Sequence, residues 1–319
     1  MKHIRIAVVL MALALSATAA FAKSDVLSLV PADAVSVGVI KLAELRTSPL
    51  SSTLFRQADK LGGNGEADQF LTDAGLDPAR DIDVLVVATS PKTRLGSEGE
   101  VLVLANGRFN VERLTEALAS RGAVKKSGYY TLPEAKQDGH HGAVAFPDAT
   151  LAIIGTEAAV TEALEARANG GTAFGMSILG RDAARIDTNV SAWAVVDVTR
   201  AARLTGANRL QTRKDQSGQA LAAAIKSVST VALWATDSGD AVKIGAFGLA
   251  NDAETLELLE DTIRGALSAM RLAVKEKSPD LVSVLRRFDV SRTSDSVRIT
   301  GTIPGDAIRK LMAEKRAAK

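Results

Sequence analysis

Cysteine is absent from all 319 residues of this chain, and histidine and aromatic residues are scarce. Without cysteine the protein has no disulfide, no thiol nucleophile and no thiolate ligand for zinc or an iron–sulfur cluster. Aromatic residues make up 4% of the sequence, so few rings are available to stack on nucleic-acid bases. These absences exclude cysteine chemistry and disfavour a nucleic-acid partner.

The chain also lacks a net charge once its first residues are set aside. The sequence has 39 Lys and Arg against 37 Asp and Glu, and Lys2 and Arg5 account for the whole excess. Residues 23–319 are therefore formally neutral. A neutral chain has no wide cationic surface of the kind that binds DNA or RNA. We expect no nucleic-acid partner.

Residues 1–22 have the three parts of a cleavable secretory signal peptide. A cationic start is followed by an apolar run at 6–15, and Ala20 and Ala22 give the small-x-small pattern that a signal peptidase accepts. The apolar run is shorter than the about 20 residues that span a bilayer. An uncleaved membrane anchor is the alternative. We expect a periplasmic or secreted protein with no membrane span after signal cleavage.

Strand and helix signals alternate through the rest of the chain. Asn110, Thr156 and Asp252 each stand as an N-cap before a helical apolar stripe. Short β-branched runs bounded by Gly, Pro or Asp predict strands. The predicted strands are 35–42, 82–89, 101–105, 143–146, 151–154, 192–198, 230–235, 241–247 and 296–302. Hairpins interspersed with helices indicate the α+β class.

The two halves of the chain repeat one another in the order of their elements. The matched runs are 37–42 with 193–198, 87–89 with 234–236, 110–114 with 252–256, and 153–156 with 299–302. Such a long period is typical of tandem domain-sized units. We predict two related units, 23–170 and 191–319, each a largely antiparallel sheet with helices packed on one face, joined by a linker at 171–190. Alternatively, any two α+β stretches of this element order align equally well.

The predicted mature chain opens with a short turn motif ahead of its first strand. The motif is Leu29-Val-Pro-Ala-Asp-Ala34, and Leu42-Ala-Glu-Leu45 follows the strand. In this it resembles a loose group of uncharacterised exported bacterial proteins that share a Pro-Ala-Asp-type mature N-terminus. The resemblance implies an envelope protein without assigned chemistry, and it carries over no functional residue.

One short segment offers the side chains of a metal site. The two histidines beyond residue 22 are adjacent, His140 and His141, and Asp138 precedes them in a Gly-flanked stretch. A carboxylate and two imidazoles are possible zinc ligands. Without further ligands at suitable spacing, however, the same residues are typical of a solvated turn. Asp138, His140 and His141 are the candidate metal ligands, and the solvated turn is the favoured interpretation.

Other catalytic and cofactor patterns are missing. The sequence has no Gly-x-Ser-x-Gly elbow, no Ser-x-x-Lys pair, no phosphate-binding loop and no dinucleotide fingerprint. Carboxylates are abundant: Asp81 and Asp83 flank a strand start, and Glu257, Glu260 and Asp261 lie on a predicted helix. We interpret these as solvated charges, predict no cofactor, and identify no catalytic residue.

The first hypothesis is therefore a non-enzymatic binding or structural protein of the bacterial envelope, whose partner is an unidentified envelope protein or ligand. The loops at 90–99 and around His140 are its predicted binding surface. One alternative is a periplasmic hydrolase that uses carboxylates or the His140/His141 loop. Another is a carrier for a hydrophobic envelope molecule. An acid–imidazole cluster would favour the hydrolase, and an apolar cavity would favour the carrier.

Overall fold

The computed structural model describes residues 26–48, 66–91, 99–133, 142–187, 189–205, 227–275 and 279–310. Helices and antiparallel strands are mixed along this part of the chain, as the α+β class requires. The elements up to residue 168 are β1 (Ser36–Ile40), α2 (Leu42–Leu45), α4 (Glu66–Ala74), α5 (Pro78–Asp81), β2 (Ile82–Ser90), β3 (Glu100–Gly107), α6 (Val111–Ser120), β4 (Val124–Lys125), β5 (Tyr130–Thr131), β6 (Gly142–Asp148), β7 (Leu151–Thr156) and α7 (Glu157–Ala168). After them come η1 (Phe174–Met176), α8 (Ile178–Ala183), β8 (Ala192–Asp197), α9 (Val198–Thr205), β9 (Thr230–Asp237), β10 (Ala241–Leu249), α11 (Ala253–Val274), α12 (Pro279–Leu285), β11 (Asp289–Arg292) and β12 (Ser296–Pro304).

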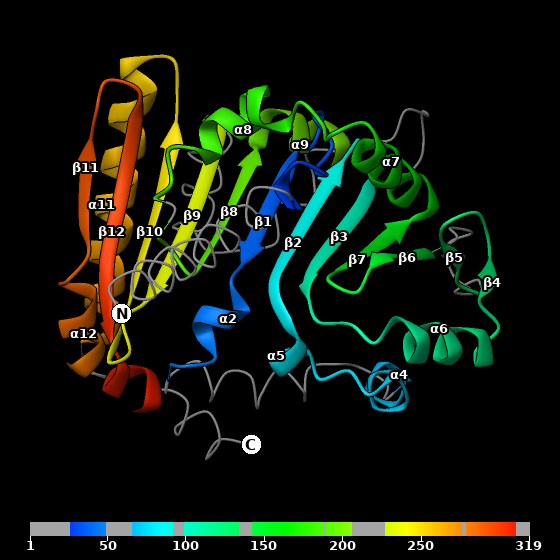
Figure 1. Cartoon of the computed structure of the whole chain (residues 1–319). Coiled ribbons are helices and arrows are strands. Elements are labelled where there is room, and N and C mark those ends of the chain that lie inside the picture. The colour runs from blue at the N-terminus through cyan, green and yellow to red at the C-terminus, as the bar shows by residue number, and fades with distance from the viewer. Residues whose placement is uncertain are drawn as a thin grey trace, which may run out of the picture.

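The described strands form one continuous sheet in which each strand runs antiparallel to its neighbours (Figure 1). The order is β11-β12-β10-β9-β8-β1-β2-β3-β7-β6-β5-β4. The two halves of the chain meet in the middle, where β1 pairs with β8 and Gly38 lies opposite Ala194. Here the structure differs from the prediction of one sheet per unit. The reason is that the β1–β8 pairing satisfies backbone groups that would otherwise form two open edges.

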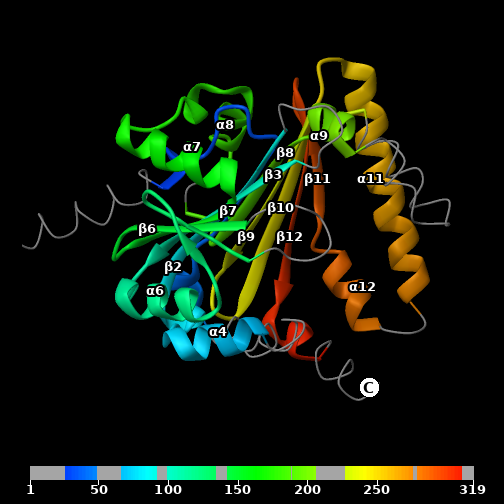
Figure 2. The same cartoon turned by 90° about the vertical axis from the view of Figure 1, so that its right-hand side faces the viewer.

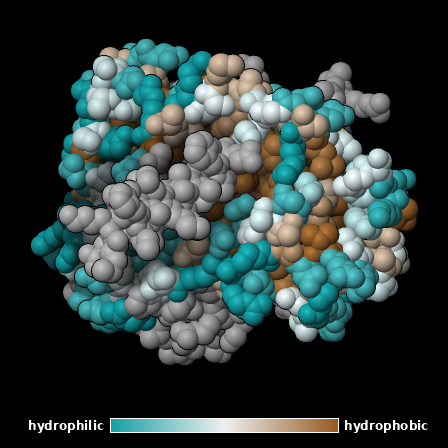
Figure 3. Space-filling model, viewed as in Figure 1, coloured by the Kyte–Doolittle hydropathy of each residue, from teal (hydrophilic) through white to brown (hydrophobic). Residues whose placement is uncertain are grey.

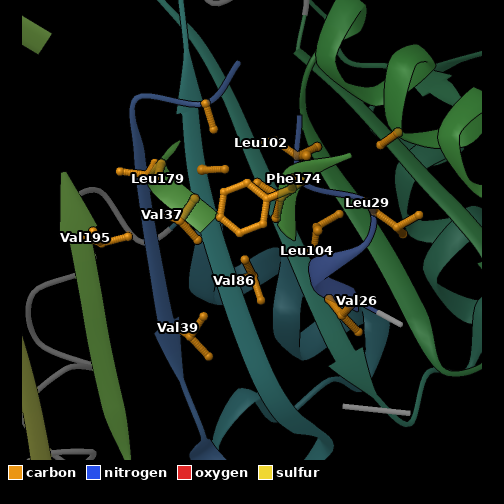
Figure 4. Packing of buried hydrophobic residues seen from close by; sticks show 14 of the residues in the cluster. Val26, Leu29, Val37, Val39, Val86, Leu102, Leu104, Phe174, Leu179 and Val195 are labelled. Atoms are coloured by element: carbon orange, nitrogen blue, oxygen red, sulfur yellow. The ribbon is translucent and has the colours of Figure 1, made fainter. Parts of the chain in front are cut away.

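The first face of the sheet carries the main hydrophobic core. Side chains alternate between the two faces of a strand, and Val37, Val86 and Leu104 point to this face, where they are at most 1% exposed. Phe174 of η1 and Leu179 of α8 pack against them. In Figure 4 the ring of Phe174 lies at the centre of this cluster. The η1–α8 segment, together with α7, therefore covers the first face.

The second face is also covered by helices, at both ends of the sheet. Leu114 of α6 packs against Ala105 of β3 in one cluster, and Leu259 of α11 packs in another with Val297 of β12. Figure 2 shows α11 and α12 on one side of the strands and α7 and α8 on the other. Helices thus lie on both faces, unlike the one-face arrangement predicted, because the strands present buried apolar side chains on both.

Local sequence signals account for most element boundaries. The side chains of Asn110, Thr156 and Asp252 each accept a hydrogen bond from the backbone N–H three residues later, as predicted for N-caps. All nine predicted strands are present. The pattern missed β4 and β5, which have two residues each, and β11, a polar strand in which only Val290 is buried.

The segment 171–190, predicted as a linker, is an integral part of the packed structure. It contains η1 and α8, and Phe174, Leu179, Ile186 and Val190 are 2–6% exposed. These four side chains belong to the main core cluster on the first face. The join between the halves is therefore a structural layer, and this layer forms one wall of the cavity described next.

Candidate functional site

A cavity of about 920 Å³ lies on the first face, between β1 and β2 and the η1–α8 segment. We call it the first-face cavity. Val39 and Val86 of the strands line one side, and Phe174, Ala183 and Ile186 line the other. Most of its lining is apolar, and its volume is within the about 300–1,000 Å³ typical of small-molecule sites. Figure 3 shows hydrophobic residues gathered in the middle of the view, where β2 and β3 lie.

Small residues in the η1–α8 segment keep this cavity open. Gly175, Gly180 and Ala183 line it. Gly180 is required by close packing, because a Cβ there would lie 2.0 Å from the carbonyl oxygen of Phe174. At Gly175, by contrast, an added Cβ would meet no heavy atom within 4 Å. Larger side chains at Gly175 or Ala183 would reduce the space.

A few polar groups line the first-face cavity, and the local structure holds each carboxylate. Asp83 accepts a hydrogen bond from Arg46 at 2.7 Å, and Asp187 accepts one from the backbone N–H of Asn189 at 2.9 Å. The side chain of Lys41 is 8% exposed. An apolar lining with few polar groups is the usual composition of a binding pocket for an organic ligand.

A second hollow, of about 510 Å³, lies on the second face over the middle of the sheet. We call it the central groove. Its base includes the small residues Gly38 and Ala194, which face each other across β1 and β8. Ile40, Val87 and Leu233 line it and are 38%, 37% and 54% exposed. The groove is lined entirely by apolar residues and glycine.

The two tryptophans stand next to one another in the middle of the sheet. Trp193 of β8 lies opposite Trp234 of β9, and both are partly buried against the main core. Trp193 lines both hollows, whereas Trp234 lines the central groove only. The fluorescence of Trp193 can therefore report on the first-face cavity.

The predicted metal ligands Asp138, His140 and His141 lie outside the described residues, as do residues 92–98 of the predicted binding loop and the predicted signal peptide. Within the described ranges, no group of three or more His, Asp and Glu side chains is placed to hold a metal ion. In the same ranges, no helix is both long and apolar enough to cross a bilayer.

Four of the carboxylates that a hydrolase could use are engaged in ion pairs: Asp81, Asp83, Glu257 and Glu260. Asp81 pairs with Arg80 at 2.8 Å, while Glu257 and Glu260 both pair with Arg292, at 3.3 and 3.2 Å. The α5 pair and the α11 pairs lie in different parts of the fold.

The α5 ion pair predicts a measurable pH dependence of stability. The hydrogen bond from Arg80 lowers the pKa of Asp81 to about 2. A lowered folded-state pKa contributes stability that is present above the unfolded value of about 3.9 and is lost as pH falls towards the folded value. In urea unfolding between about pH 4 and pH 2, Asp81→Asn should lose less stability than the unaltered chain, and Arg80→Met should lie between them. Parallel curves for all three proteins would contradict this assignment.

Sequence reasoning missed the residues of the first-face cavity, although two signals were present. The predicted linker contains the large apolar residues Phe174, Leu179 and Ile186, which a simple connector between two units does not need. In β1, the alternation of Val37 and Val39 with their neighbours places Lys41 on the same, buried face. The apolar residues of the predicted linker mark one wall of the first-face cavity, and the alternation in β1 marks the other.

Comparisons with known proteins show a similarity of fold alone. No protein-family model matches the sequence, and no curated protein matches it. The solved structures of TP0453 in crystal forms I and III superpose with TM-scores of 0.50 and 0.51, at 10% and 11% sequence identity. The matches cover 91% of this chain and 97% and 98% of TP0453. At this identity the chain is similar to TP0453 in fold alone.

Proposed function

We propose that this protein is a non-enzymatic binding protein that carries a hydrophobic small molecule in the first-face cavity. The observation that supports this most strongly is the cavity itself, about 920 Å³ in volume with Val39, Val86, Phe174 and Ile186 among its lining. A carrier for a hydrophobic molecule needs an apolar cavity, whereas a purely structural module does not. Transfer of an apolar ligand from water into such a site is favourable in proportion to the apolar area buried.

The polar groups at the cavity favour binding over catalysis. Asp83 is held by Arg46, and Asp187 by a backbone N–H. A general acid or base must be within hydrogen-bond reach of a reacting group, and these carboxylates have structural partners instead. No specific observation favours the hydrolase, whose candidate histidines lie outside the described residues.

Filling the cavity should weaken the binding of an uncharged apolar dye. Ala183→Phe places a ring in the space, and we expect at least about tenfold weaker binding of N-phenyl-1-naphthylamine in a fluorescence titration, a change of about 1.4 kcal/mol. Ala158→Phe is the matched control, because Ala158 is exposed on α7. It should bind the dye as the unaltered chain does.

A second cavity-filling variant, Gly175→Leu, provides the test if Ala183→Phe does not fold. Gly175→Leu has room for its Cβ and should weaken dye binding in the same direction. Unchanged affinity in both folded variants, or no binding by the unaltered chain, would refute the carrier function. All of these binding measurements should use residues 23–319, the predicted mature chain.

We also propose that the two halves descend from a duplicated unit. Support comes from the strand orders β1-β2-β3-β7-β6 and β8-β9-β10-β12-β11, which run outwards from the middle of the sheet in the same sequence of connections. The register adds to it: Val37 lies opposite Val195 and Val39 opposite Trp193, symmetrically about Gly38 and Ala194. The central groove then lies where the two units join.

We propose an envelope location, periplasmic or secreted, on the basis of the signal-peptide pattern at 1–22. The formal neutrality of residues 23–319 supports a partner other than nucleic acid. N-terminal sequencing of the exported protein tests the location, and a chain that begins at Lys23 is the expected result.

A further inference from the structure

Asn106 interrupts the apolar stripe of β3 at the first-face cavity. Leu102 and Leu104 lie on the same face of the strand and are 2% and 0% exposed, whereas Asn106 is partly buried and lines the cavity. Its side-chain amide donates a hydrogen bond to the carbonyl oxygen of Thr150 at 3.1 Å. An asparagine amide has two N–H donors and an accepting oxygen. Within the described part of the chain, the amide oxygen and the second N–H of Asn106 therefore remain available to a ligand.

The strand register places Asn106 at one side of the cavity lining and Trp193 at the other. Trp193 of β8 lies opposite Val39 of β1, and Val39 lies opposite Val86 of β2. Asn106 of β3 lies opposite Val84, two residues from Val86. All five residues line the cavity, and their four strands are successive neighbours in the sheet. Because neighbouring strands are about 4.8 Å apart, the lining extends about 14 Å from the tryptophan to the amide.

The charged side chains that line the cavity already have partners. Lys41 pairs with Glu44 at 3.4 Å, and Asp83 pairs with Arg46 at 2.7 Å. The carboxylate of Asp187 accepts a backbone N–H. A charged head group would lose its water in this cavity without gaining an unopposed counter-charge, and such a transfer is costly. The charges at the cavity therefore favour an uncharged ligand.

We propose that the first-face cavity binds an uncharged lipid with a hydroxyl head, such as a long-chain alcohol, and that Asn106 is the residue that recognises this head. The inference rests on the proposed carrier function and specifies its ligand class. The hydroxyl donates a hydrogen bond to Oδ1 of Asn106, and the alkyl tail lies along Val39 and Val86 towards Trp193. A site that hydrogen-bonds a hydroxyl discriminates against an analogue without one, because its own polar group is then left unpaired.

The test measures how 1-decanol and its methyl ether, which has the same tail but no hydroxyl donor, displace N-phenyl-1-naphthylamine from residues 23–319. The ratio of the two affinities isolates the hydroxyl from the tail. Asn106→Leu should shift this ratio towards the ether by about fivefold, the effect of one hydrogen bond. Asn106→Asp keeps an accepting oxygen but loses the donor to Thr150, so it should retain the ratio of the unaltered chain. Asn251→Leu is the matched control at an exposed position, and it should also leave the ratio unchanged.

Decanoate tests the preference for an uncharged head. At pH 7 the unaltered chain should bind decanoate at least about tenfold more weakly than 1-decanol. Equal affinity for the two, or tighter binding of decanoate, would overturn this preference.

A crystal soaked with 11-bromo-1-undecanol tests the orientation of the ligand without any variant. The bromine should give an anomalous peak beside Trp193, with the hydroxyl within hydrogen-bond distance of the Asn106 amide. The reverse orientation, an unchanged affinity ratio in folded Asn106→Leu, or an equal shift in Asn106→Asp would overturn the role of Asn106 and leave the carrier function standing. Failure of all of these probes to bind in the first-face cavity would overturn the carrier function as well.

Discussion

Replacing Leu104 with alanine is expected to lower the free energy of unfolding by about 2–5 kcal/mol. Leu104 is 0% exposed on β3, in the middle of the main core, between Val86 of β2 and Ile153 of β7 in the strand register. These close-packed neighbours relax only partly when a side chain is shortened. The loss therefore includes a cavity term in addition to the lost burial.

Equilibrium urea unfolding at neutral pH measures this loss. Leu272→Ala is the control with the same chemical change, because Leu272 is 73% exposed on α11. It should alter the free energy of unfolding by about 0.5 kcal/mol or less. A loss below about 1 kcal/mol for Leu104→Ala, against the range for buried leucines, would mean that the main core lies elsewhere.

Phe174→Ala is expected to affect both stability and binding. The ring is 5% exposed, packs in the main core and lines the first-face cavity (Figure 4). Removal of a buried phenylalanine side chain costs about 3–5 kcal/mol. Because the same ring forms part of the cavity wall, dye affinity should also fall by at least about tenfold, or 1.4 kcal/mol.

Phe109→Ala separates these two effects. Phe109 is 6% exposed and packs with Phe146 in the α6 cluster on the second face, away from the first-face cavity. Its replacement should cost a similar free energy of unfolding, yet leave binding of N-phenyl-1-naphthylamine unchanged. If both variants lose dye affinity equally, the loss reflects general destabilisation, and Phe174 has no specific part in binding.

Local sequence signals predicted the helices and strands well, but they could not predict how elements distant in the sequence pack together. The N-caps at Asn110, Thr156 and Asp252 and the central strands depend on neighbouring residues, so the sequence pattern located them. The pairing of β1 with β8 depends on which edge strand of one half meets which edge strand of the other half. Periodicity within a strand carries no information about that choice.

The candidate site was harder to predict for the same reason. The first-face cavity joins Val39 of β1 to residues of the predicted linker, such as Phe174 and Ile186, more than 130 positions apart in the sequence. Its lining consists of ordinary apolar residues with no motif, and it exists because small residues such as Gly175 and Ala183 leave space between two layers. The sequence instead offered Asp138, His140 and His141 as candidate metal ligands, because their side-chain chemistry can be recognised without knowledge of packing.

The most direct test of the central claim is a crystal structure of residues 23–319 soaked with 1-bromododecane and measured at the bromine absorption edge. The carrier account predicts an anomalous peak inside the first-face cavity, beside Val39, Val86 and Phe174, and its loss in Ala183→Phe. An empty first-face cavity, with bromine only in the central groove or nowhere on the protein, would contradict it.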